Sequence, residues 1–254
     1  MEYTQAVVRA CLGARPHRYF ERIRSTMDAA REWLLTDAPH GALVITGEQT
    51  AGRGRMGRSW LTPDGCALAM SVILRPASGT ALPQVSMLGG LAVLDALASL
   101  GLPNLFLKWP NDILIGEKKV CGVLVETAWE GVYLRGAILG IGLNVTGAFD
   151  EPEISAIATT VTEALGRPVD AGAVLRAVVR HLDMRLPDLD TPEMFDAWRS
   201  RLGTIGQRVR VEGSSAFEGV AEDVNMTGAL LVRADDGQLR TVLAGDVRVR
   251  PAQR

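Results

Sequence analysis

The sequence predicts an α+β protein in which helices back a mixed β-sheet and a small five-stranded β-barrel follows. Three observations support this class. Apolar segments typical of strands are concentrated in the middle of the chain, and helical segments lie on either side of them. After residue 202 the sequence pattern changes, because short β-type segments alternate with glycine turns. We therefore divide the chain into residues 1–202 and residues 203–254.

The first part begins with a predicted helix at residues 27–35, where Ser25, Thr26 and Asp28 supply the oxygen atoms that cap free N–H groups. The elements that follow are strands at residues 42–48 and 66–74, a long apolar interior helix at 83–100, strands at 105–108, 112–116, 119–127 and 132–145, and helices at 153–165, 171–185 and 191–200. The last four of these strands alternate like a meander, with turns at residues 116–118 and 129–131.

The second part contains five short β-type segments, at residues 207–211, 216–223, 229–233, 239–243 and 246–250. Glycines such as Gly213, Gly228 and Gly245 separate them, and tight turns between short strands predict a small barrel. Such a barrel is either an appendage for solubility and folding or a docking surface for a partner. The sequence leaves both interpretations open.

The composition indicates a cytoplasmic protein. The 254 residues are enough for one large and one small domain, and a formal net charge of −2 lacks the long-range field of a general nucleic-acid binder. Three widely spaced cysteines, Cys11, Cys66 and Cys121, predict reduced, buried thiols without a disulfide framework or zinc site. We expect no signal peptide, and no apolar run long enough to span a membrane.

Residues 52–60 carry the strongest functional signal. The first seven of them contain three arginines and three glycines, and the segment ends at Trp60. Guanidinium groups match carboxylate and phosphate oxygens, while glycine lets the backbone approach a ligand closely. Because three like charges repel one another, we expect this loop to become ordered only around a polyanion. The predicted strands on either side fix both of its ends.

Three further clusters accompany this loop. Lys108, Asn111 and Asp112 surround a proline turn between two strands, so their side chains should converge at one sheet edge. Lys119 begins a strand, and Asn144 ends another after two glycines. Each cluster alone has an ordinary explanation, because lysines at strand ends are often solvated charges and asparagine is a turn former. Together, and in this order, they predict one site.

In this combination the segments resemble the biotin protein ligases. The resemblance covers residues 25–27, 49–58, 108–112, 119–126 and 140–144, and it extends to the terminal barrel. It implies a class II synthetase-like catalytic domain and two steps. Biotin and ATP first form biotinyl-5′-AMP and pyrophosphate, and the biotinyl group then passes to one lysine of a biotin carboxyl carrier domain. Repressor members carry an N-terminal DNA-binding domain, for which we expect no room here, so the resemblance implies the monofunctional type.

The resemblance also implies roles for individual residues. The biotin-binding residues would be Ser25, Thr26, Gln49, Gly52, Arg53, Arg55, Lys119 and Gly122. The ATP-binding residues would be Arg53, Arg55, Arg58, Trp60, Lys108, Asn111, Asp112 and Asn144. Lys119, Arg55 and Lys108 would be catalytic, and Asp112 would hold Mg²⁺. Lys119 would bridge the biotin carboxylate and the α-phosphate, and Trp60 would stack on adenine unless it is a core aromatic. Gly122 would allow the backbone to approach biotin.

Met56 stands where many family members have arginine, so we expect it to face outward or to contact the apolar side of biotin. The closest alternative is an acyl-adenylate enzyme for lipoate or octanoate. A nucleic-acid binder would carry several Arg-Gly repeats and a basic charge. A biotin sensor without catalysis would most readily have lost Lys119 or residues 108–112. The expected partners are biotin, ATP, Mg²⁺ and the carrier domain of a carboxylase, without DNA or membrane, and the chain would be a monomer or homodimer.

Overall fold

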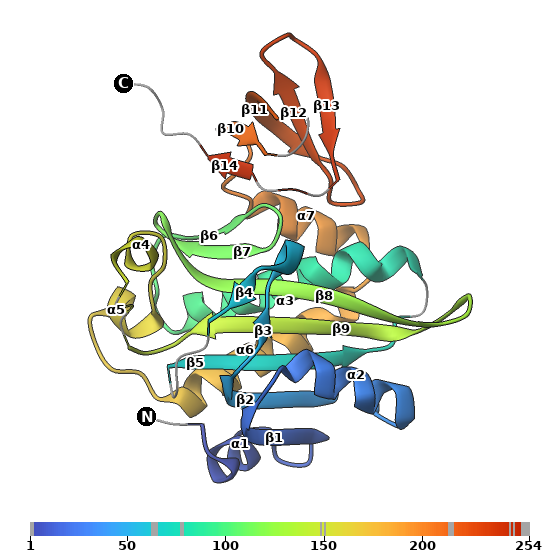
Figure 1. Ribbon diagram of the computed structural model, residues 1–254, viewed down its shortest axis with the longest axis vertical. Coiled ribbons are helices and arrows are strands. Elements are labelled where there is room, and N and C mark those ends of the chain that lie inside the picture. Colours follow the sequence, from blue (N-terminus) through green and yellow to red (C-terminus); the bar gives the residue numbers. More distant parts are fainter. Residues whose placement is uncertain are drawn as a thin grey trace.

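The computed structural model describes residues 3–61, 66–76, 79–147, 149, 151–212, 216–243, 245 and 247–249. Within these residues the chain forms a large sheet covered by helices and a smaller sheet near the C-terminus (Figure 1). The predicted α+β class, with a mixed sheet backed by helices, is confirmed.

The large sheet has seven strands in the order β1-β2-β5-β9-β8-β7-β6. Their bounds are β1 His17–Ile23, β2 Leu43–Gln49, β5 Ala67–Leu74, β6 Leu105–Lys108, β7 Asp112–Ile115, β8 Lys118–Glu130 and β9 Tyr133–Asn144. Strands β1 and β2 are parallel and the other neighbours are antiparallel, which makes the sheet mixed. Because each of β6 to β9 pairs with the next in sequence, the predicted meander is confirmed.

Helices cover both faces of this sheet. They are α1 Gln5–Leu12, α2 Thr26–Thr36, α3 Leu82–Ser99, α4 Pro152–Ser155, α5 Val161–Leu165, α6 Ala171–Arg185 and α7 Pro192–Ser200. In Figure 1, α2 lies in front of the sheet, and α3, α6 and α7 lie behind it. Successive strand residues point to opposite faces. Accordingly Val44 and Ile73 pack in the cluster that contains α2, whereas Ile45 and Leu74 belong to the larger core on the other face.

Helix α3 lies at the centre of the larger core. By length and composition alone it is apolar enough to cross a membrane, so the expectation that no apolar run reaches that length was wrong. However, 67% of the helix is buried inside the protein, as predicted for an interior helix. Gly89 allows close packing on the sheet, because a Cβ there would lie 2.7 Å from Leu139 Cδ1.

The sequence analysis missed helix α1 and strand β1. Thr4 caps α1 by accepting a hydrogen bond from Val7 N at 3.3 Å, a signal that could have been recognised. Strand β1 is an edge strand, and its burial pattern does not alternate. Without a period of two, its charged sequence gave no strand signal.

The helix predicted at residues 153–165 is two short helices. Thr160 caps α5, because its Oγ1 accepts a hydrogen bond from Glu163 N at 3.2 Å. Between the helices, Ala158 forms a parallel β-bridge with Lys119. The tertiary hydrogen bonds to β8 therefore break a segment whose local pattern favours one continuous helix.

The C-terminal strands form an antiparallel sheet in the order β13-β12-β11-β10-β14. Their bounds are β10 Arg208–Val211, β11 Phe217–Val224, β12 Leu230–Ala234, β13 Leu239–Val242 and β14 Val247–Val249. All five predicted strands are present. Among the described residues β13 and β14 lie at opposite edges and do not pair, so a closed barrel is not confirmed.

Trp109 joins the smaller sheet to the larger one. Its side chain is only 2% exposed, and its Nε1 donates a hydrogen bond to the carbonyl of Gly228 at 2.8 Å. Its backbone N–H donates to Thr204 Oγ1 at 2.9 Å. The turn between β6 and β7 is therefore held against the start of the C-terminal region.

The three cysteines are free thiols. Only Cys121 is buried, and burial raises the pKa of its thiol. Cys11 and Cys66 are partly exposed, so the prediction of buried thiols holds for Cys121 alone.

Candidate active site

A cavity of about 760 Å³ lies on the face of the large sheet that carries α2. Strands β8 and β9 form its floor, the start of α2 forms one side, and the turn between β6 and β7 forms another. Two short strands, β3 (Gly52–Arg53) and β4 (Ser59–Trp60), cross in front of this floor (Figure 1). Gly245 and Val247 from the C-terminal region also line the cavity.

Most of the residues predicted from the sequence line this cavity. They are Ser25, Thr26, Gln49, Arg53, Arg55, Arg58, Trp60, Lys108, Asn111, Asp112, Lys119 and Gly122. Segments distant in the sequence therefore meet at one place.

Two predicted residues, Gly52 and Asn144, are not in the cavity lining. Asn144 is 6% exposed, and its Nδ2 donates a hydrogen bond to Thr159 O at 3.1 Å, which fastens the segment before α5. A Cβ on Gly52 would lie 2.9 Å from Gln49 Nε2, so its lack of a side chain serves packing. The geometry therefore gives both residues structural tasks, and their predicted ligand contacts stay predictions.

The arginine segment is a small hairpin, which we call the lid. Arg53 pairs with Ser59 at its root, and Gly54 N donates to Arg58 O at 2.7 Å across its tip. Met56 has a φ of 56°, and Gly57 has a φ of 74°. Met56 is 71% exposed and does not line the cavity, which confirms that it faces outward.

The floor beneath the lid is made of glycines. Gly122 on β8 is the register partner of Gly142 on β9, and the indole of Trp60 rests above this pair. A Cβ on Gly142 would lie 2.6 Å from Trp60 Nε1, and one on Gly122 would lie 3.1 Å from Trp60 Cζ3. Trp60 Nε1 is buried and has no hydrogen-bond partner among the described residues. The indole of Trp60 therefore occupies the space above Gly122 that we predicted for biotin.

Gly140 and Gly142 line the cavity but were not assigned to the site from the sequence. The signal that could have found them is strand alternation, since residues 140, 142 and 144 share one face of β9. From the sequence, only Asn144, the polar residue of this series, received a role, and the two glycines received none. Met27 was also missed, and a Cβ on Gly140 would lie 2.8 Å from its sulfur.

Lys119 lies at the centre of the charged groups. Its Nζ is 2.7 Å from Asp112 Oδ1 and 5.2 Å from the centroid of the Trp60 ring, which adds a cation–π contact. Its backbone is also fixed, because Lys119 N donates to Ile157 O at 2.8 Å and Thr159 N donates to Lys119 O at 2.9 Å. The amine is therefore presented from a rigid strand end.

Arg55 reaches the same region from the lid. Its Nη1 donates a hydrogen bond to Asn111 Oδ1 at the long distance of 3.4 Å. Burial lowers the pKa of Arg55, and the neighbouring Arg58 acts in the same direction, against the opposing charge of Asp112. Such a shift marks a guanidinium whose positive charge is under-compensated and favours an added anion.

Polar side chains from three elements meet at the other end of the cavity. Gln49 Oε1 accepts hydrogen bonds from Thr26 N at 2.9 Å and from Thr26 Oγ1 at 3.1 Å. Ser71 Oγ in turn donates to Thr26 Oγ1 at 2.8 Å. This network fixes an amide and two hydroxyls at the N-terminus of α2, where Ser25 is the cap. Hydroxyl and amide groups suit a ligand that has both donors and acceptors.

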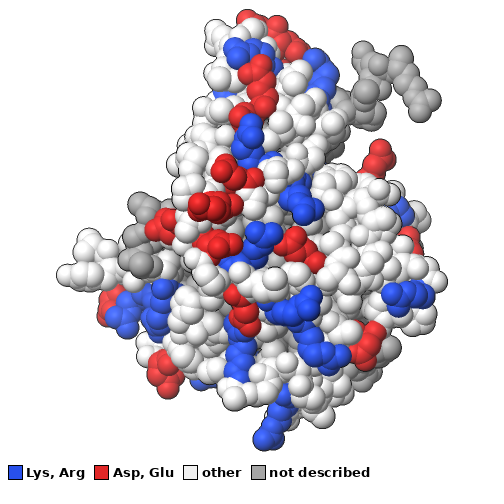
Figure 2. Space-filling model, turned by 180° about the vertical axis from the view of Figure 1, so that it is seen from behind, with Lys and Arg blue, Asp and Glu red and all other residues white. Residues whose placement is uncertain are grey.

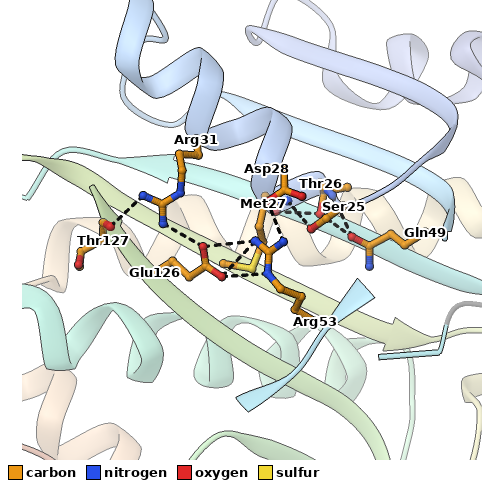
Figure 3. Close-up of polar contacts among 10 residues, drawn as sticks. Ser25, Thr26, Met27, Asp28, Arg31, Gln49, Arg53, Glu126 and Thr127 are labelled. Carbon is orange, nitrogen blue, oxygen red and sulfur yellow. Dashed lines mark hydrogen bonds and ion pairs between the residues drawn. The ribbon is translucent and has the colours of Figure 1, made fainter. Parts of the chain in front are cut away.

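Two carboxylates hold the side chain of Arg53 (Figure 3). Its Nη1 is 2.7 Å from Asp28 Oδ1, and its Nη2 is 3.1 Å from Glu126 Oε1. Burial alone would lower its pKa, but the hydrogen bond to Asp28 and the charge of Glu126 outweigh burial and raise it. Arg53 is thus a compensated cation.

Asp112 is the residue predicted to hold Mg²⁺. The described residues contain no cluster of three or more His, Cys, Asp or Glu side chains that would hold a metal by themselves. Mg²⁺ with a nucleotide needs only one or two carboxylates in addition to phosphates, and both Asp112 and Glu117 line the cavity. The residues therefore fit the ion, provided that the Asp112–Lys119 pair opens.

A glycine floor, a cationic lid and a lysine at the sheet edge define a site for small anionic substrates. Residues 19–144 match the Biotin/lipoate A/B protein ligase family, and residues 204–250 match the Biotin protein ligase C terminal domain. The chain belongs to this family of ligases.

Individual relatives agree with the family match. The chain is 36% identical over 216 residues to a biotin--[acetyl-CoA-carboxylase] ligase of Mycobacterium tuberculosis, covering 82% of this chain and 78% of the relative. It is 34% identical over 207 residues to one of Paracoccus denitrificans, covering 78% of this chain and 86% of the relative. Among solved structures, the biotin protein ligase of Aquifex aeolicus in complex with biotin and ATP is similar, with a TM-score of 0.79. It is 29% identical in sequence, over 93% of this chain and 99% of that one.

Proposed function

We propose that this biotin protein ligase activates biotin with ATP to biotinyl-5′-AMP and pyrophosphate, and then transfers biotin to a lysine of a carboxyl carrier domain. The observation that carries the proposal is the convergence of Arg55 and Arg58 from the lid with Lys108 and Lys119 from the sheet edge around one cavity. The match of residues 204–250 to the biotin ligase C-terminal domain does not favour the alternative, a lipoate or octanoate ligase.

The first step requires charge neutralisation. The biotin carboxylate is ionised at neutral pH, so it attacks the α-phosphate directly and needs no protein nucleophile. Two anions must approach, and negative charge grows on the phosphoryl oxygens as pyrophosphate leaves. Lys119 is the residue we assign to the carboxylate and the α-phosphate, with Arg55 and Lys108 as further cations. Fixed cations lower this barrier because they need no reorganisation during the reaction.

Mg²⁺ bound with the nucleotide would supply additional positive charge on the phosphates. Asp112 is the residue we assign to it. Since Asp112 Oδ1 is 2.7 Å from Lys119 Nζ, substrate binding would separate this pair and release both groups. Lys119 would then face the biotin carboxylate and the α-phosphate.

The second step is acyl transfer. The neutral amine of the carrier lysine attacks the carbonyl carbon of the mixed anhydride, AMP leaves, and an amide bond forms. A closed lid would exclude water from the anhydride until the carrier arrives.

The remaining assignments complete the proposal. Ser25, Thr26 and Gln49 bind the ureido head of biotin, and Gly122 gives room for its approach. Arg58, Trp60 and Asn111 serve the nucleotide. If Trp60 stacks on adenine, its indole must leave the glycine floor on which it rests.

We further propose that the chain works in the cytoplasm without binding DNA, as a monomer or homodimer. We also keep the division at residues 1–202 and 203–254. The two family matches support this division, because they fall on either side of residue 203. We assign the C-terminal region the role of completing the cavity, since Gly245 and Val247 line it.

The test is pyrophosphate release from ATP with biotin, lipoate or octanoate, followed by mass spectrometry of a carrier domain incubated with the enzyme. We expect release with biotin only, and a carrier heavier by one biotinyl group. Release with lipoate and not with biotin would replace the proposal by its alternative. Biotin binding without any release would indicate a sensor.

A further inference from the structure

Two carboxylates behind the cavity hold Arg53 at the root of the lid, and we call Asp28 and Glu126 the carboxylate clamp. All three guanidinium nitrogens of Arg53 are engaged. Nη1 donates to Asp28 Oδ1 at 2.7 Å, Nε donates to Glu126 Oε1 at 3.2 Å, and Nη2 donates to the same oxygen at 3.1 Å. Neither carboxylate lines the cavity.

Glu126 is itself fixed from a second side (Figure 3). Arg31 on α2 donates through Nη2 to Glu126 Oε2 at 2.9 Å and through Nη1 to Thr127 O at 3.2 Å. The clamp therefore connects α2, strand β8 and strand β3. The Glu126 side chain is 24% exposed and that of Asp28 is 46% exposed, so Glu126 is the better protected of the two carboxylates from solvent.

The charges in this group cancel, because two arginines face two carboxylates. A phosphate placed beside Arg53 would meet little net positive charge. Arg55 is only two residues away, but the one side-chain hydrogen bond that it makes among the described residues is the long one to Asn111. The two lid arginines thus differ, since one is anchored at the root and the other is loosely held near the tip.

We propose that Glu126, assisted by Asp28, is a positioning residue that anchors the lid root through Arg53. This proposal rests on the function proposed above and assigns Arg53 to the lid instead of the phosphates. The tip, including Arg55, closes over the adenylate by moving relative to this anchored root. Weakening the clamp loosens closure, so that biotinyl-5′-AMP escapes and hydrolyses before the carrier lysine attacks it.

The decisive variant is Glu126→Gln, which keeps size and removes the charge. Its matched control is Glu130→Gln on the same strand, where Glu130 is 74% exposed and pairs with Arg135 at 3.3 Å. The measurement is the ratio of pyrophosphate released to biotin transferred, with excess carrier domain from a bacterial acetyl-CoA carboxylase. We expect a ratio near one for the wild type and Glu130→Gln. For Glu126→Gln we expect this ratio to rise about fivefold, because the variant loses the charge of the partly buried carboxylate that holds Arg53.

Arg53→Lys and the double variant Arg53→Lys/Glu126→Gln separate anchoring from direct phosphate contact. If Arg53 acts through the clamp, Arg53→Lys raises the same ratio and the double variant is no worse than either single one. Effects that multiply, or a slower first step with an unchanged ratio, would assign Arg53 to the phosphates and overturn the proposal. A faster first step in Glu126→Gln with a ratio of one would overturn it as well.

Limited trypsin digestion tests the clamp without any activity. We expect cleavage after Arg55 and Arg58 to be about fivefold faster in Glu126→Gln than in the wild type, and unchanged in Glu130→Gln. Circular dichroism and thermal unfolding verify that each variant is folded. Asp28→Asn serves as a second variant, for which we expect a smaller effect on digestion. If wild type and control release no pyrophosphate with biotin, the proposed function fails. Equal digestion rates for all variants would mean that the carboxylate clamp does not anchor the lid.

Discussion

Arginines are prominent both in the lid and on the C-terminal sheet, but the two regions compensate their charges differently. On the sheet, Arg208 Nη2 lies 2.6 Å from Asp235 Oδ2, and Arg233 Nη2 lies 2.9 Å from Glu222 Oε2. Figure 2 shows basic and acidic groups beside one another over this upper part of the molecule. In the lid, the pKa of Arg55 is lowered by burial, and Arg58 adds a like charge.

An arginine whose charge is not compensated by a carboxylate therefore indicates an anion site better than an arginine as such. An arginine with a bidentate carboxylate has little remaining affinity for another anion. An arginine held against another cation and partly buried gains when an anion arrives. By this criterion Arg53 resembles the sheet arginines more than it resembles Arg55.

The largest effect expected from this comparison is that of Lys119→Ala. Lys119 faces the cavity, whereas Lys118 beside it pairs with Glu163 at 3.6 Å and does not line the cavity. We expect Lys119→Ala to reduce biotin-dependent pyrophosphate release by about 10²- to 10³-fold. Lys118→Ala should stay near wild type. Similar rates for both variants would remove Lys119 from the first step.

Next in size is Arg55→Ala. Loss of an under-compensated cation should slow pyrophosphate release by about tenfold or more, while thermal stability stays unchanged. Arg208→Ala on the C-terminal sheet is the matched control and should leave the rate unchanged. If both variants slow the reaction equally, compensation of charge does not distinguish the two regions.

The smallest effect concerns pH and stability. Arg199 Nε lies 2.6 Å from Asp223 Oδ1, and this hydrogen bond lowers the pKa of Asp223 against the effect of burial. A carboxyl with a lowered folded pKa contributes stability above its unfolded pKa of about 4 and loses it as pH falls through the folded value. In urea unfolding at about pH 6 and about pH 2.5, Asp223→Asn should therefore lose less stability on acidification than the wild type. If Asp223→Asn and the wild type lose the same stability between the two pH values, the Arg199–Asp223 pair does not contribute to folding stability.

Much of the site was predictable because its residue types are dictated by chemistry. Residues 52–58 combine glycine and arginine as an anion site requires, and Lys119 with Asp112 stands out at a predicted strand start and turn. The floor was harder to predict, since Gly140 and Gly142 carry no functional group. Their meaning depends on Trp60 lying above them.

The class of fold, most helices and strands, and the identity of the charged groups could all be predicted from the amino-acid sequence alone. These properties follow from local periodicity, capping and side-chain chemistry, which act over a few residues. Which arginines are paired with carboxylates depends on the tertiary structure. Asp28 and Glu126 are far from Arg53 in the sequence and meet it only after α2 packs on the sheet. Packing also split the helix predicted at residues 153–165, because long-range hydrogen bonds to β8 outweigh local preference.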